Sequence, residues 1–171
     1  MTWGIPTDTF LQIHVVLSLI GIASGLVVLY GLLKGEPLDG WTALFLATTI
    51  LTGVTGFPLP PFGWDPARTV GVILLVLLAV AVAARYAFHL AGAWRWIYVV
   101  SAVLALYLNV FVGVIQAFQK LAFLQPLAPT QSEPPFVISQ ALLLIAFVVL
   151  GALAVRRFHP DPRATATLRP A

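Results

Sequence analysis

Long apolar stretches separated by short polar or proline-rich segments dominate the sequence. A bilayer core of about 30 Å takes about 20 helical residues, and five stretches are long enough to be candidates. They cover residues 10–33, 41–57, 69–91, 94–118 and 136–155. Pro58 ends the second and shortest stretch, because proline interrupts helical hydrogen bonding. The pattern predicts an all-α integral membrane protein, with a bundle of five transmembrane helices over residues 1–157 and a basic cytoplasmic tail over 158–171.

The composition agrees with a membrane protein and excludes other classes. Of the 171 residues, 60% are hydrophobic and only 9% are charged, whereas soluble domains carry about 25% charged residues. This balance excludes a soluble enzyme and a disordered chain. Cysteine is absent, which excludes disulfides and thiolate-bound metals or clusters. The net charge of +3 does not indicate a nucleic-acid partner, because the basic residues lie at the ends of the apolar stretches.

The distribution of lysine and arginine predicts the orientation. Arg68 and Lys120 fall at one set of helix ends, and the other basic residues fall at the opposite set: Lys34, Arg85, Arg95, Arg156, Arg157, Arg163 and Arg169. Cytoplasmic ends carry the excess of basic residues, so the N-terminus is expected outside and the C-terminus inside. No basic residue precedes the first stretch, so we expect a retained span and not a cleaved signal peptide.

Small and polar residues recur at helical spacing on the first, second and fourth predicted helices. Gly21 and Gly25 form a GxxxG motif on the first helix, and Gly113 lies on the small-residue face of the fourth. Such positions let helix backbones approach closely in a membrane. We therefore expect these three helices to pack together, with the third and fifth helices more exposed to lipid.

Six polar residues are candidates for one outward-facing ligand pocket: His14, Thr52, Thr55, Asn109, Gln116 and Gln140. In the predicted orientation most of them fall in the outer half of their helices. Polar groups at one depth in a membrane indicate a functional site. The alternative is that the threonines and Asn109 only join helices through hydrogen bonds, and that His14 lies in the headgroup layer.

The histidines do not predict a shared haem or a metal centre. His14 lies near the outer end of its helix, His89 lies at the inner end of the third helix, and His159 lies in the tail. A haem on His14 alone, or a bound quinone, stays open as an alternative. No His/Asp/Glu spacing fits a metal site, and no catalytic motif is present. We expect Arg85 to extend its guanidinium to the cytoplasmic headgroups beside Tyr86.

Several segments resemble a group of small bacterial inner-membrane proteins that has no assigned function. The resemblance lies in residues 52–57 (TGVTGF), 92–98 (GAWRWIY), 108–111 (LNVF), 116–120 (QAFQK) and 128–135 (APTQSEPP). It covers the chain from the first predicted helix to the fifth. The resemblance implies the bacterial inner membrane as location and implies no activity.

Abundant packing faces and scarce reactive chemistry favour a non-enzymatic multi-pass membrane protein. The leading hypothesis is an oligomer or an accessory subunit of a larger membrane complex, with lipid and other membrane subunits as partners and no nucleic acid. The alternative is a small carrier, channel or lipid- or quinone-binding protein that uses the outward-facing pocket. A third hypothesis is a redox subunit with one haem on His14.

Overall fold

The computed structural model describes residues 1–60 and 63–159, and these residues are helical apart from short connections and one isolated bridge between Thr2 and Ile5. The long helices are α1 (Thr7–Lys34), α2 (Asp39–Gly56), α3 (Pro66–Val82), α4 (Trp94–Lys120) and α5 (Pro134–Arg157). A π-helical turn, η1 (Ala83–Ala87), continues α3, and a short 3-10 turn, η2 (Gln125–Leu127), lies between α4 and α5.

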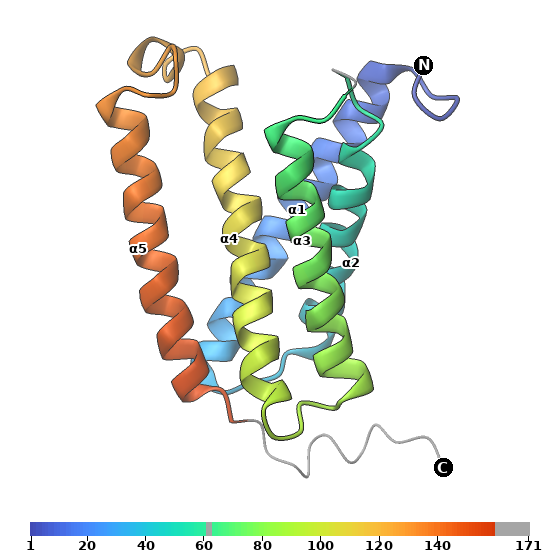
Figure 1. Cartoon of the computed structure of the whole chain (residues 1–171), viewed down its shortest axis with the longest axis vertical. Helices are drawn as coiled ribbons and strands as arrows, with labels where there is room; N and C mark the ends of the chain where they lie inside the picture. The colour runs from blue at the N-terminus through green and yellow to red at the C-terminus, as the bar shows by residue number, and fades with distance from the viewer. Residues whose placement is uncertain (61–62, 160–171) are drawn as a thin grey trace.

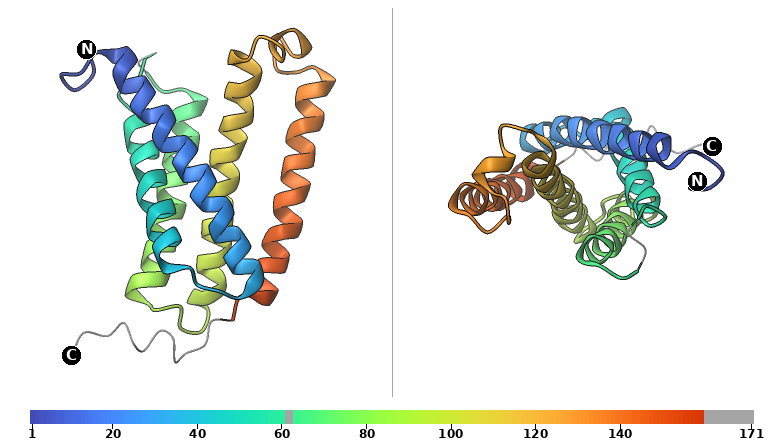
Figure 2. Two further views of the ribbon diagram at one scale, coloured as in Figure 1. Left: turned by 180° about the vertical axis from the view of Figure 1, so that it is seen from behind. Right: turned by 90° about the horizontal axis from the view of Figure 1, so that it is seen from above.

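Consecutive helices run antiparallel to one another, so the chain passes up and down along one bundle (Figure 1). The helices α1 to α4 surround a common core, and α5 lies outside them against α4 and α1 (Figure 2). Helix α1 crosses the bundle diagonally, from α2 near the N-terminus towards α5 at the other end (Figure 2). The N-terminus and the last turn of α5 therefore lie at opposite ends, called here the N-terminal and C-terminal ends of the bundle (Figure 1).

Four of the helices are long and apolar enough to cross a membrane. They are α1, α3 together with η1, α4 and α5. This finding supports the predicted class of a helical membrane protein. Helix α2 is not one of the four, because its 18 residues include Asp39 and many threonines.

Local sequence explains where several helices begin and end. The side chain of Asp65 accepts a hydrogen bond from the backbone N–H of Arg68 at 2.8 Å, and Pro66 occupies the first position of α3. Both features favour a helix start. Gly35 ends α1 with a φ of +79°, a left-handed conformation that glycine adopts without steric cost.

Helices α3 and α5 are less buried than α1 and α4, as predicted, but α3 also contributes to the core. Only 22% of the most apolar part of α3 is buried, but α3 packs between α2 and α4, and Leu78 and Ala81 are fully buried. Helix α5 fits the prediction better, because only 6% of its most apolar part is buried. An apolar sequence does not separate core from lipid contact, since both environments are apolar.

The third helix ends earlier than predicted, at Ala87 instead of residue 91. The backbone N–H of Phe88 donates to the carbonyl of Ala83 at 2.9 Å and closes the π-helical turn. The Phe88 ring stacks on Trp94 with a centroid distance of 3.8 Å. Gly92 has a φ of +53° but lies in the turn and does not cap α3.

The bundle extends into the predicted tail. Phe158 is fully buried and its ring lies 6.0 Å from that of Tyr98. The guanidinium of Arg95 donates to the carbonyls of Val155 at 3.1 Å and Phe158 at 2.6 Å. The rest of the tail, residues 160–171, lies outside the described residues.

Candidate functional site

A column of polar side chains between α1, α2 and α4 begins near the N-terminal end with His14. Its Nδ1 atom lies 2.9 Å from Oγ1 of Thr55. The Thr55 hydroxyl lies 2.7 Å from the carbonyl of Leu51 and donates its single proton there. Nδ1–H of His14 therefore donates to Thr55, and Nε2 keeps its lone pair. A haem on His14 would bind through Nε2, and this hypothesis stays a prediction.

Buried threonines continue the column along α2. The hydroxyl of Thr52 donates to the carbonyl of Thr48 at 2.9 Å, and that of Thr48 donates to the carbonyl of Leu44 at 2.7 Å. Both residues are less than 10% exposed. Each hydroxyl proton is thus satisfied within the helix, and the oxygens stay available as acceptors.

The centre of the column is a group that we call the Gly21 cluster: Gly21, Thr48, Thr49 and Asn109. A Cβ atom placed on Gly21 would lie 2.9 Å from Thr49 Oγ1, 3.1 Å from Asn109 Nδ2 and 3.5 Å from Thr48 Oγ1. The three side chains therefore converge on one point of the α1 backbone, from α2 and α4.

Two polar atoms of the Gly21 cluster are buried without a partner. Thr49 is 0% exposed and Asn109 is 5% exposed. Within the described part of the chain, neither Thr49 Oγ1 nor Asn109 Nδ2 has a hydrogen-bond partner. A helix-joining asparagine is expected to hydrogen bond across the interface, and Asn109 Nδ2 makes no such bond in this part of the chain.

Apolar side chains close the column one turn further along α1. A Cβ atom on Gly25 would lie 2.5 Å from Leu106 Cδ1 and 2.9 Å from the ring of Phe45. Phe45 and Leu106 are almost fully buried. The Gly21 cluster is thus separated from the polar groups at the C-terminal end of the bundle.

Arg85 forms the centre of those other polar groups. Its side chain is 7% exposed, pairs with the Asp39 carboxylate and donates to the carbonyl of Pro37 at 3.0 Å. The guanidinium also lies 5.3 Å from the ring centre of Tyr98. The expectation that Arg85 extends to the headgroups is therefore wrong. The connection from α1 to α2 supplies the carbonyl and the first residue of α2 supplies the carboxylate, and the sequence pattern did not reveal either contact.

Two of the six predicted pocket residues lie away from the column. Gln140 donates from Nε2 to the carbonyl of Phe111 at 3.2 Å, between α5 and α4. Gln116 is exposed. Grouping by depth alone therefore brought together residues from different interfaces. The structure adds Thr49 to the polar side chains of the column; Thr49 follows Thr48 directly in the sequence. It also shows that the polar atoms surround Gly21.

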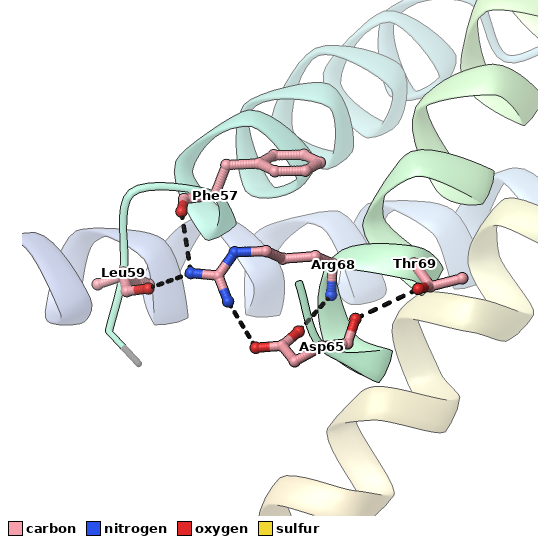
Figure 3. A network of polar contacts seen from close by, with 5 residues as sticks. All are labelled: Phe57, Leu59, Asp65, Arg68 and Thr69. Atoms are coloured by element: carbon pink, nitrogen blue, oxygen red, sulfur yellow. Dashed lines mark hydrogen bonds and ion pairs between the residues drawn. The ribbon is translucent and has the colours of Figure 1, made fainter. Parts of the chain in front are cut away.

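The N-terminal end of the bundle carries a polar network that holds a loop in place (Figure 3). Arg68 pairs with Asp65 at 2.5 Å and donates to the carbonyls of Phe57 at 3.2 Å and Leu59 at 2.8 Å. Thr69 donates from its hydroxyl to the Asp65 carbonyl at 3.2 Å. These contacts join the end of α2 to the start of α3, so Arg68 has a structural role.

Two cavities lie elsewhere in the molecule. One, of about 470 Å³, lies at the connection from α4 to α5 beside Phe118 and Thr130. The other, of about 380 Å³, lies between α4 and α5 beside Val103 and Phe147. None of the six predicted pocket residues lines either cavity.

Neither a metal centre nor a relative assigns a role to the column. Among residues 1–60 and 63–159, no three His, Asp or Glu side chains come close enough to hold a metal ion. No family model, no curated protein and no solved structure matches this chain. In the part of the chain that the structure describes, the fold is all-helical, with four candidate membrane-spanning helices and a buried column of polar side chains.

Proposed function

We propose that the chain spans the inner membrane of a bacterium five times, with its N-terminus outside. Helix α2 runs antiparallel beside α1 along the bundle, which supports counting it as the fifth span (Figure 1). Its threonines face α1 or donate to its own carbonyls, so their polarity does not oppose burial. The basic ends of α1 and α5 support a cytoplasmic C-terminus.

We further propose that the protein binds a small neutral ligand at the Gly21 cluster and has no enzymatic activity. The observation that supports this function is the convergence of two buried, unpartnered polar atoms on Gly21. A buried donor without a partner costs about 1–3 kcal/mol. A ligand oxygen that accepts from Asn109 Nδ2 and Thr49 Oγ1 removes this cost. Its entry requires α1 to move away from α2 and α4 at Gly21, because a Cβ atom on Gly21 would already lie 2.9 Å from Thr49 Oγ1.

The chemistry of the Gly21 cluster favours a carbonyl group on the ligand. Asn109 offers N–H donors and Thr49 offers one hydroxyl proton. None of the four cluster residues carries a charge, so an ionic ligand would lose its hydration without a counter-charge. Carbonyl-bearing molecules that dissolve in the membrane, such as quinones, fit these donors.

The test is the binding of decylubiquinone, a soluble quinone analogue, by the purified protein in detergent. We expect saturable binding to the wild type. Asn109→Leu is expected to weaken this binding about tenfold, the equivalent of about 1.4 kcal/mol. Thr52→Val is the matched control, because the Thr52 hydroxyl already donates to the carbonyl of Thr48, and it should change binding less than twofold.

Thermal unfolding of the same variants separates ligand binding from helix packing. If Asn109 serves the ligand, Asn109→Leu removes an unpaired buried amide and the unfolding temperature stays level or rises. A lower unfolding temperature together with unchanged quinone binding would contradict the proposal. So would the absence of saturable binding to the wild type.

A second candidate function is that of an accessory subunit or a homo-oligomer, and helix α5 favours it. Two of its large apolar residues, Leu142 and Ile145, are 60% exposed or more. A helix of another subunit would cover them. Size-exclusion chromatography with light scattering in mild detergent tests this candidate: an oligomer that Leu142→Lys dissociates is the expected result, and a monomer at all concentrations excludes the homo-oligomer.

A further inference from the structure

An apolar groove between α4 and α5 ends at an arginine. The groove has a volume of about 380 Å³. Its walls include Val103 and Leu104 of α4 and Phe147, Val148 and Gly151 of α5, and Arg156 lies at its end. The groove belongs to a different interface from the Gly21 cluster, so the inference drawn from it does not depend on the proposed function.

The helical spacing explains why the groove runs along α5. Phe147, Gly151 and Val155 follow one another at intervals of four residues, as do Val148, Ala152 and Arg156, so they form one continuous stripe. Gly151 marks a close approach, because a Cβ atom there would lie 3.2 Å from Val103 Cγ1. The two helices that form the groove therefore approach each other closely at Gly151.

The charge at the end of the groove has no carboxylate partner among residues 1–60 and 63–159. Arg95, which lies nearby, donates hydrogen bonds to the carbonyls of Val155 and Phe158. In the part of the chain that the structure describes, carboxylates pair only with Arg68 and Arg85. Arg156 is exposed in the last turn of α5, so its guanidinium can meet an anion outside the protein.

We propose that this groove binds one anionic phospholipid. An acyl chain lies along the apolar walls, and the headgroup phosphate accepts hydrogen bonds from Arg156. The proposal is based on complementarity: the groove has apolar walls and a cation at its end, and an anionic phospholipid has an apolar acyl chain and an anionic headgroup. Basic pockets between membrane helices bind anionic headgroups in this way, and guanidinium pairs well with phosphate. A zwitterionic lipid carries the same phosphate, but its own cation balances that charge, so Arg156 attracts it less strongly than an anionic lipid.

The experiment measures retained lipid by native mass spectrometry of the full-length protein in detergent, with phosphatidylglycerol or phosphatidylcholine added. We expect one phosphatidylglycerol per chain to be retained in preference to phosphatidylcholine. Arg156→Gln should weaken phosphatidylglycerol binding about fivefold, since one arginine near an anionic lipid contributes about 1 kcal/mol. Arg157→Gln is the matched control, because Arg157 has the same charge and does not line the groove, and it should change binding less than twofold.

A second variant tests the apolar part of the groove. Ala152 is exposed and lines the groove, so Ala152→Trp is expected to fill the groove without disturbing the core, and to reduce lipid retention. Equal retention of the two lipids by the wild type would overturn the proposal. Equal losses from Arg156→Gln and Arg157→Gln would also overturn it, because they would indicate a general surface charge effect. A dimer that retains no lipid would assign the groove to a second copy of the chain.

Discussion

At the residue scale, Gly25 is the glycine of α1 at which an added Cβ atom would come nearest to another side chain. The Cβ atom of any other residue would lie 2.5 Å from Leu106 and 2.9 Å from Phe45, both of which are buried. Gly71 of α3 differs, because a Cβ atom there would be 3.6 Å from Phe57, an ordinary contact. Both glycines are helical, so they form a matched pair in which only the space differs.

We predict that Gly25→Ala destabilises the protein by about 1–3 kcal/mol, because the added methyl group forces buried side chains to move. Gly71→Ala should leave stability unchanged or raise it by up to about 1 kcal/mol, through the higher helix propensity of alanine. Thermal unfolding in detergent, followed by tryptophan fluorescence, compares the two. Equal stability of the two variants would contradict the close approach at Gly25.

At the scale of elements, the connection between α2 and α3 depends on one side chain. Arg68 is only 11% exposed and binds two carbonyls after α2 and the carboxylate before α3. These carbonyls belong to the end of a helix and the loop after it, where backbone acceptors lack partners within the helix. The arginine thus does more than balance the charge of Asp65.

We predict that Arg68→Gln lowers stability by about 1–3 kcal/mol, since it leaves partly buried acceptors without a donor. Lys120→Gln, at an exposed position in the last turn of α4, is the control and should change stability by less than about 0.5 kcal/mol. Chemical or thermal unfolding of both variants measures the difference. Similar effects from the two substitutions would mean that the Arg68 network does not stabilise the bundle.

At the scale of the whole molecule, the number of membrane spans determines where every polar side chain lies. Five spans place the two ends of the chain on opposite sides of the membrane. If α2 does not cross, the connections before and after it lie on the same side. The side reached by each connection therefore decides between four and five spans.

We predict that reporters fused after Lys34, Arg68, Arg95, Lys120 and Ala171 lie inside, outside, inside, outside and inside the cell. Paired alkaline phosphatase and green fluorescent protein fusions measure this pattern, because each is active on one side of the membrane only. Reporters after Lys34 and Arg68 on the same side would exclude α2 as a span. A C-terminal reporter outside would reverse the proposed orientation.

The sequence by itself determined the helical class and the positions of the long apolar helices. Hydrophobic length measured against bilayer thickness is a local property, and glycine or proline near a helix end acts on its own turn. The prediction from sequence nevertheless extended the third helix beyond Ala87. The helix ends there because of the π-helical turn and the stacking of Phe88 on Trp94, which depend on how the chain folds back.

Only the tertiary structure decided which polar groups meet. Asn109 and Thr49 converge on Gly21, Arg85 turns inward to Asp39, and α3 joins the core. These contacts depend on the tilt and rotation of helices that are far apart in the sequence. Hydropathy does not encode them, since an apolar residue suits the lipid and the core equally well, and a polar residue finds its partner only where two helices cross.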